Sequence, residues 1–79
     1  MTLFVAQISG HLQNQTLGEV IEAVGASDRF AVSGGTASGW DTSVRPEFEA
    51  LDQADAESTA ATLAAGIPGF RVDWVRPKA

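Results

Sequence analysis

The chain has 79 residues, of which 44% are hydrophobic and 19% charged, a balance typical of one small globular domain and not of a disordered segment. Its formal net charge is −5, which disfavours direct binding to nucleic acid or to an anionic membrane surface. The absence of cysteine excludes disulfides, thiol nucleophiles and cysteine-based metal sites. We therefore expect a single domain, residues 1–79, with no cofactor and no metal.

No segment approaches the roughly 20 apolar residues that a membrane-spanning helix requires. The sequence MTLFVAQISG lacks the basic start and the long apolar run of a signal peptide. We expect a cytoplasmic protein that does not bind membranes.

The first half of the chain predicts a strand, a short helix and a second strand. Thr2–Ser9 is apolar on both faces, which favours a central strand. Thr16–Gly25 has apolar residues at helical spacing, a capping box formed by Thr16 with Glu19, and a terminal glycine suited to a left-handed conformation. A strand in an all-antiparallel meander is the alternative for this segment, because short apolar runs fit both structures. Arg29–Ser33 is the second predicted strand.

The middle of the chain predicts a turn followed by a long strand. Gly34–Gly39 contains three glycines and is expected to be a flexible hairpin turn. Trp40–Ala50 alternates with period two, which indicates a strand with one buried face. Pro46 has no amide donor, so we expect a bulge or a change of pairing there.

The stretch from Leu51 to Arg76 predicts a helix followed by the last strand. Asp52 is a suitable N-cap, and Gly66 with Pro68 ends the helix. The following strand alternates, with Phe70, Val72 and Trp74 predicted to point inward and the intervening side chains outward. The predicted outward set is Arg71, Asp73 and Val75.

The order strand, helix, strand, strand, helix, strand predicts the fold class. It is an α+β single small domain with the ferredoxin-like split β-α-β (βαββαβ) arrangement, a four-stranded antiparallel sheet with two helices on one face. The expected strand order is 4-1-3-2, which places the first and third strands in the centre.

No motif points to catalysis. The single histidine, His11, lies in a polar segment without a second histidine or cysteine to complete a triad or a metal site. The glycine-rich GGTASG lacks the Lys-Ser/Thr that follows in a phosphate-binding loop. Carboxylates such as Asp52 and Asp55 are explained by helix capping. We predict no enzyme, and neither catalytic nor cofactor-binding residues.

The open face of the sheet and the acidic residues remain as candidates for function. An apolar centre inside a charged rim is typical of a protein-binding surface. We therefore predict a small acidic protein-interaction module, acting on a protein partner or in a homodimer or larger assembly. The candidate partner-binding residues are Glu47, Glu49, Glu57, Trp40, Arg45, Arg71, Asp73 and Val75.

Two alternatives stay open. The first is a phage-type acidic inhibitor or nucleic-acid mimic, in which the acidic segment Glu47–Glu57 occupies a basic groove of a target protein. The second is a small-molecule-binding regulatory domain, because folds of this shape also carry ligand sites.

Overall fold

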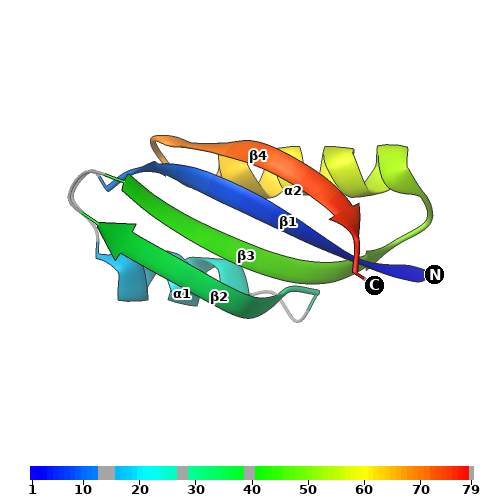
Figure 1. Ribbon diagram of the computed structural model, residues 1–79, viewed down its shortest axis with the longest axis horizontal. Coiled ribbons are helices and arrows are strands. Elements are labelled where there is room, and N and C mark those ends of the chain that lie inside the picture. The colour runs from blue at the N-terminus through cyan, green and yellow to red at the C-terminus, as the bar shows by residue number, and fades with distance from the viewer. Residues whose placement is uncertain (13–15, 27–28, 39–40, 79) are drawn as a thin grey trace.

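The computed structural model describes residues 1–12, 16–26, 29–38 and 41–78. These residues form a small α+β domain with two helices and one antiparallel sheet (Figure 1). In chain order the elements are β1 (Thr2–His11), α1 (Leu17–Gly25), β2 (Ala31–Ser38), β3 (Asp41–Ala50), α2 (Gln53–Ala65) and β4 (Phe70–Pro77). The predicted Trp40 lies outside the described residues.

The four strands of the sheet lie in the order β2-β3-β1-β4, and every neighbouring pair is antiparallel. β1 and β3 are central, and they pair from Thr2 opposite Ala50 to His11 opposite Asp41. β2 and β4 are the edge strands. The central position of β1 agrees with its two apolar faces.

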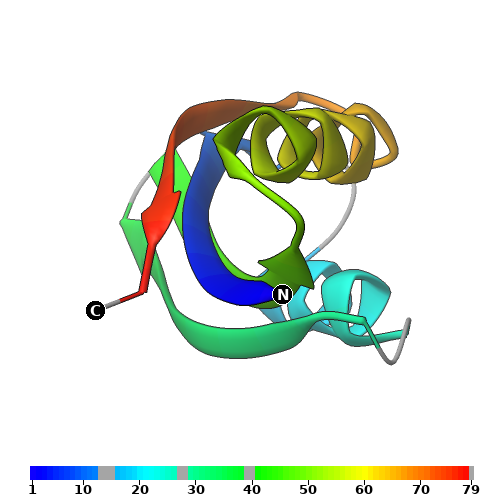
Figure 2. The same ribbon diagram turned by 90° about the vertical axis from the view of Figure 1, so that its right-hand side faces the viewer.

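Both helices pack on one face of the sheet. Figure 2 shows α1 and α2 on the concave side of the curved sheet, with the other side open. Alternate residues of β1 turn toward the helices and are fully buried, among them Phe4, Ala6 and Ile8. One group of core side chains joins Phe4 and Phe48 to the alanines of α2. A second group joins Ile8 to Val20 and Val24 of α1 and to residues at the end of α2.

The segment that the sequence left open between helix and strand is the helix α1. Thr16 is its N-cap, and the Thr16 hydroxyl oxygen accepts a hydrogen bond from the Glu19 amide at 3.2 Å. Val20 and Val24 are its buried residues. The expected left-handed Gly25 is wrong, because Gly25 is the last helical residue and Gly69 is the one described glycine with positive φ.

The helix α2 begins as predicted. The Asp52 side chain accepts a hydrogen bond from the Asp55 amide at 2.8 Å, and Asp55 in turn accepts one from the Leu51 amide at 3.0 Å. The buried residues Ala56, Ala60 and Ala64 form its contact face. Because this face consists of alanine methyl groups, α2 lies close to the strands beneath it. The side chain of Gln53 donates to the Val75 carbonyl at 2.8 Å and so ties the first turn of α2 to β4.

The described part of the predicted turn, residues 34–38, is a strand, and Gly39 lies outside the described residues. β2 runs on through Gly34 and Gly35 to Ser38, paired with β3. A Cβ atom at Gly34 would lie 2.8 Å from Nη2 of Arg45, the residue opposite it. Gly34 therefore leaves room for the end of the Arg45 side chain on the sheet, a neighbour that local sequence patterns do not reveal.

The expected irregularity at Pro46 is confirmed. Val32 pairs with Pro46 and Gly34 with Arg45, so β2 contains one extra residue at this point. Pro46 is itself fully buried. The bulge on β2 accommodates a strand position that has no amide hydrogen to donate.

Two glycines allow β1 and the start of β4 to approach closely. Gly69 has a φ of 83°, which side chains with a Cβ atom rarely adopt. A Cβ atom at Gly10 would overlap the Gly69 carbonyl oxygen and lie 2.9 Å from the Phe70 Cα atom. Gly10 is thus required by the backbone that connects α2 to β4.

We expect Gly10→Ala to destabilise the protein by about 1–3 kcal/mol, because the new methyl group overlaps backbone atoms that cannot move aside. Urea denaturation followed by circular dichroism measures the change. Gly25→Ala is the matched control, since a Cβ atom there meets nothing within 4 Å, and it should be neutral or stabilising by up to about 1 kcal/mol. Equal stability of the two variants would contradict this packing.

Candidate functional site

The open face of the sheet is formed by the side chains that point away from the helices. Register places residues of β3, β1 and β4 in rows across this face. In one row Val5 lies between Glu47 and Arg76, and in another Ser9 lies between Ser43 and Arg71. On this face the central strand β1 therefore carries apolar residues at one end, Leu3 and Val5, and polar Gln7 and Ser9 further along, with charged residues on both neighbouring strands.

A β-bulge in β4 decides which side chains reach this face. Ile8 pairs with Val72 but Gln7 pairs with Trp74, so Asp73 is an extra residue in β4. Beyond it the alternation of β4 is reversed. Trp74 takes the side of Gln7, which is the open face, and Val75 takes the side of the fully buried Ala6. A strand that gains one residue exchanges its two faces from that point on.

Two predicted orientations are therefore wrong. Trp74 is not a core residue but lies partly buried on the open face, and Val75 does not point outward but packs against the core residues around Phe4 and Phe48. Val72, before the bulge, points inward as expected. The period-two pattern of the sequence cannot show an inserted residue, because the letters on both sides still alternate.

Trp74 is covered by a neighbouring arginine. The guanidinium carbon of Arg76 lies 4.1 Å from the centroid of the Trp74 ring, within the distance of a cation–π contact. Leu3, which is 40% exposed, and the partly buried Val5 lie on the neighbouring strand β1. Together Leu3, Val5, Trp74 and the stacked Arg76 form what we call the apolar centre of the open face.

Charged groups surround the apolar centre and pair across it. Nζ of Lys78 lies 2.8 Å from Oε1 of Glu47, and the Lys78 amide donates to the Leu3 carbonyl at 2.9 Å. Glu47 is only 13% exposed, whereas Lys78 is 47% exposed. The ion pair thus reaches from β4 over β1 to β3. Because one partner remains well hydrated, we expect it to contribute at most about 1 kcal/mol to stability.

Asp73, the bulge residue, is held by three neighbours. The hydroxyl of Ser9 donates to its carboxylate, Nε2 of Gln7 donates to Oδ2 at 3.1 Å, and the Arg71 guanidinium lies 3.8 Å away. The Ser9 hydrogen bond is the largest cause of a pKa below the usual range of an aspartate, and partial burial opposes it. The bulge therefore carries a carboxylate that stays ionised in the folded protein.

The other predicted residues are divided among surfaces. Glu49 lies in the row of Leu3 on the open face, and Arg45 lies opposite Gly34. Glu57 is exposed on α2, where it accepts a hydrogen bond from Gln53 at 2.9 Å. The acidic segment Glu47–Glu57 is thus not one surface, because the strand carboxylates and the helix carboxylates lie on opposite sides of the sheet.

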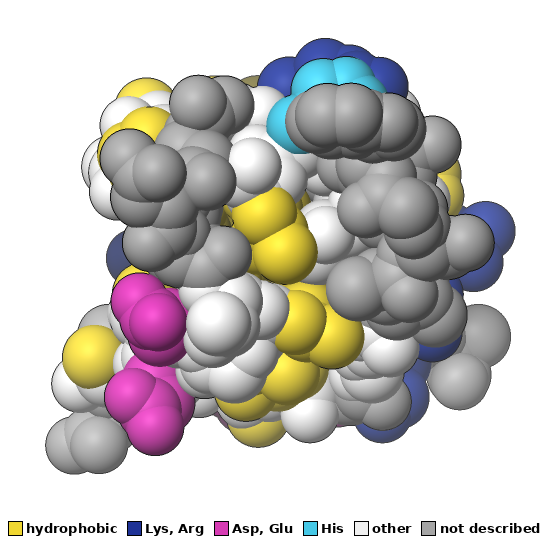
Figure 3. Space-filling view, turned by 90° about the vertical axis from the view of Figure 1, so that its left-hand side faces the viewer, with side chains coloured by type: hydrophobic (Ala, Val, Ile, Leu, Met, Phe, Trp, Pro, Cys, Tyr) yellow, Lys and Arg dark blue, Asp and Glu magenta, His cyan; other side chains and the backbone are white. Residues whose placement is uncertain are grey.

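Charge is divided between the two sides of the domain. Neither helix contains lysine or arginine, and the acidic residues of the helical side are Glu19, Glu22, Asp52, Asp55 and Glu57. Most of the basic residues belong to β3 and β4 or follow β4, namely Arg45, Arg71, Arg76 and Lys78. In Figure 3 the open face is on the right, where basic side chains gather, and acidic side chains lie on the left. The net negative charge therefore belongs to the helices.

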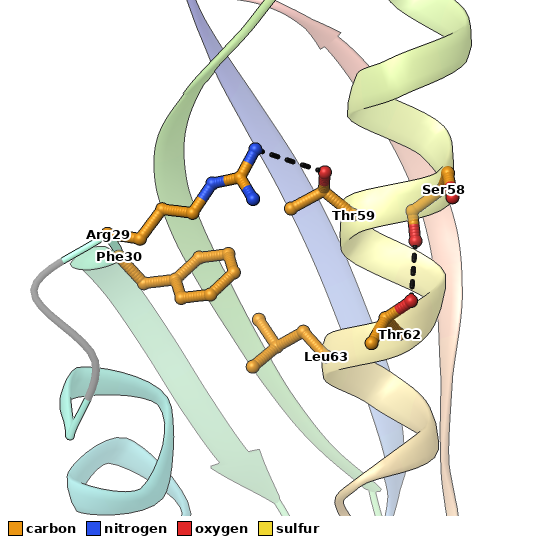
Figure 4. A pocket seen from close by; sticks show the side chains of 6 residues that line it. All are labelled: Arg29, Phe30, Ser58, Thr59, Thr62 and Leu63. Carbon is orange, nitrogen blue, oxygen red and sulfur yellow. Dashed lines mark hydrogen bonds between the residues drawn. The ribbon is translucent and has the colours of Figure 1, made fainter.

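A hollow of about 440 Å³ lies on the helical side, between the start of β2 and α2. Figure 4 shows Phe30 and Leu63 at its base, with Arg29 and three hydroxyl-bearing residues of α2 around it. Nη2 of Arg29 donates to Oγ1 of Thr59 and to the Glu49 carbonyl, each at 3.3 Å. Thr62 donates to the Ser58 carbonyl at 3.0 Å. These polar groups connect β2, β3 and α2, so the hollow has a structural explanation.

Within the described residues, no group of three or more histidine, aspartate or glutamate side chains is placed to hold a metal ion. Both described helices, α1 and α2, are too short to cross a membrane. No family model and no curated protein matches the chain.

Sequence analysis missed Trp74, Arg76 and Lys78 as members of the open face. The spacing of Trp74 and Arg76 is the feature that could have indicated their contact, because residues two apart on a strand share a face and their side chains can stack. That signal assigns them to a common side but not to the open side. Only the pairing of β4 with Gln7 and Ile8 does so.

We expect Trp74→Ala to leave the protein folded, with a loss of about 1 kcal/mol, because it removes a surface stacking contact and leaves no core cavity. Phe48→Ala is the matched control. Phe48 is 1% exposed, and its truncation costs about 3–5 kcal/mol, which equals the whole stability expected of so small a domain. Thermal denaturation followed by circular dichroism compares the two. Unfolding of both variants would contradict the outward position of Trp74.

The lowered pKa of Asp73 predicts how stability depends on pH. The ionised Asp73 contributes to the free energy of unfolding at pH values above 3.8, the pKa of the group in the unfolded chain. This contribution is lost as the pH falls through the lower pKa of the folded state. Asp73→Asn should therefore be less stable than the wild type at neutral pH, by an amount that shrinks below about pH 4. Urea denaturation at several pH values measures this difference.

An NMR titration of the Asp73 carboxyl group provides the control. Ser9→Ala removes the largest cause of the shift and should raise the Asp73 pKa. A wild-type value at or above 3.8 would contradict the arrangement at the bulge.

Proposed function

We propose that the protein is a small acidic, non-enzymatic protein-interaction module that binds its partner through the open face of the sheet. The observation that carries this proposal is the bulge at Asp73, which turns Trp74 away from the core and onto the open face, level with Gln7 and one row from Val5. An aromatic ring on a solvent-facing sheet is costly unless a partner or a neighbouring side chain covers it. Arg76 covers one face of the ring.

The composition of the face supports a protein partner. Tryptophan and arginine are the residues most enriched among those that contribute most binding energy in protein interfaces. A small apolar centre within a polar, charged border is the usual anatomy of such an interface. Carboxylates on β3 and cations on β4 would require a partner with a similarly mixed surface, and this provides specificity.

The same composition opposes direct nucleic-acid binding. Sheets of this type that bind single-stranded RNA use several stacked aromatic rings and a positive surface. Among the described residues the open face offers one aromatic ring, and Glu47 and Glu49 lie in rows beside the cations. The carboxylates would repel a phosphate backbone.

We propose that the fold is the ferredoxin-like split β-α-β arrangement. The element order, the antiparallel strand order β2-β3-β1-β4 and the position of both helices on the concave side support it. The fold by itself does not specify a function. The cytoplasmic location expected from the sequence stays a prediction.

A second candidate function is an acidic inhibitor or nucleic-acid mimic. The observation that favours it is the helical side, whose exposed carboxylates include Glu19, Glu22 and Glu57 while neither helix has a basic residue. This surface would fit a basic groove of a target protein. It differs from the open face, so the two candidates can be tested separately.

Site-specific photo-cross-linking in cells distinguishes the two surfaces. A photoreactive amino acid replaces Gln7 on the open face in one variant and Glu22 on α1 in the other, and mass spectrometry identifies the adducts. We expect a discrete protein adduct from position 7 and none from position 22. Adducts from position 22 alone would favour the acidic mimic, and the absence of adducts from both would contradict an interaction module.

A further inference from the structure

We propose that the partner of the open face is a second copy of this chain, related by a two-fold axis that runs parallel to β1. This inference rests on the proposed function and names its partner. It follows from the order of charges across the three strands β3, β1 and β4. When a second copy is rotated by 180° about an axis along β1, its cations lie over the carboxylates of the first copy.

The order of charges is set by register. Glu49 lies level with Leu3 and Glu47 level with Val5, so this end of β3 carries two carboxylates. On the other side of β1, Arg76 lies level with Val5. The Lys78 amide donates to the Leu3 carbonyl, so Lys78 continues the β4 edge in that direction. The apolar residues of β1 thus separate an acidic row from a basic row.

A two-fold rotation about an axis along β1 places β3 of one copy over β4 of the other at the same level. Glu47 then faces the partner's Arg76, and Glu49 faces the partner's Lys78. By symmetry the two contacts are repeated on the other side of the axis. Leu3 and Val5 meet their own copies on the axis, where they form an apolar strip flanked by ion pairs.

The other in-plane axis, perpendicular to the strands, gives a poorer match. It would place β3 over β3 and β4 over β4 with the levels reversed. With the axis midway along the face, Glu47 would face the partner's Arg45, but the cationic ends of β4, Arg71 and Lys78, would face each other and Glu49 would face no cation. Like charges in contact cost several kcal/mol in an interface, so the charge order selects the axis along β1.

The Lys78–Glu47 ion pair within the chain does not prevent this arrangement. Lys78 is 47% exposed, and a flexible lysine can exchange one carboxylate for another at small cost. In the proposed dimer Glu47 gains the partner's Arg76 while Lys78 moves toward the partner's Glu49. Glu49 then also acquires a cation from the second copy.

The size of the face makes the dimer reversible. Four strands about 4.8 Å apart, each of about eight residues rising 3.3 Å, give a face of roughly 500 Å². Two such faces bury about 1,000 Å², close to the lower limit for a specific interface. The open face is convex, because the helices lie on the concave side of the sheet in Figure 2, so the contact between two copies is concentrated on β1 and the adjoining parts of β3 and β4. We therefore expect a weak dimer that dissociates on dilution.

A charge-exchange experiment on the full chain tests both the dimer and its axis. One variant carries Glu47→Lys with Glu49→Lys, and the other carries Arg76→Glu with Lys78→Glu. Each variant alone brings like charges together, so its dimerisation should weaken by roughly 100-fold. An equimolar mixture restores opposite charges across the interface, and it should form heterodimers. Sedimentation equilibrium between about 1 μM and 1 mM measures the mass.

The control variant is Glu22→Lys with Glu57→Lys, which makes the same charge change as the first variant on the helical side and should dimerise like the wild type. Circular dichroism checks that each variant is folded. A monomeric wild type at about 1 mM, or a dimer that neither open-face variant weakens, would overturn the inference. A mixture that stays monomeric would overturn the proposed axis.

Failure here is distinguishable from failure of the proposed function. If the wild type is monomeric and position 7 cross-links to a different protein, the open face is still an interaction surface and only the second copy is wrong. If the photoreactive residue at position 7 cross-links two copies of this chain, and the equimolar mixture of the two charge variants forms heterodimers, both proposals hold.

Discussion

The extra residue in β4 is the constraint on which the candidate site depends. Val72 lies opposite Ile8 and Trp74 lies opposite Gln7, so Asp73 is an inserted residue. Because of this insertion, the even-numbered residue Val72 points to the core before the bulge and the odd-numbered residue Val75 does so after it. Val72 and Val75 pack inward although they are three residues apart. Without the bulge Trp74 would enter the core. The Asp73 carboxylate, bound by Ser9 and Gln7, occupies the point where the phase changes.

The bulge is supported from both ends of β4. At the start, Gly10 and Gly69 let the chain leave α2 and join β1 without steric overlap. Near the other end, Gln53 in the first turn of α2 donates to the Val75 carbonyl. The bulge and the Gln53 hydrogen bond also interrupt the row of free backbone groups on the outer edge of β4.

The two sides of the domain differ in charge for a reason that follows from their packing. The helices present alanine and valine to the sheet and carboxylates to solvent, with Asp52 and Asp55 at the start of α2 where the helix dipole favours negative charge. The sheet presents alternating charges on neighbouring strands, which pair across β1. A surface of paired charges around Leu3, Val5 and Trp74 can be desolvated at lower cost than the uniformly acidic helical side.

The sequence by itself determined the six elements, their order and the helix caps at Thr16 and Asp52, because these depend on contacts within a few residues. It also indicated that β1 is central and that pairing is irregular at Pro46. It did not determine that Gly34 and Gly35 continue β2, since the atoms close to them, the Arg45 side chain and the Ser43 carbonyl oxygen, belong to the neighbouring strand. Nor did it determine the orientation of Trp74 and Val75. An inserted residue is defined by the pairing between two strands, so the tertiary structure alone decided which side chains form the open face.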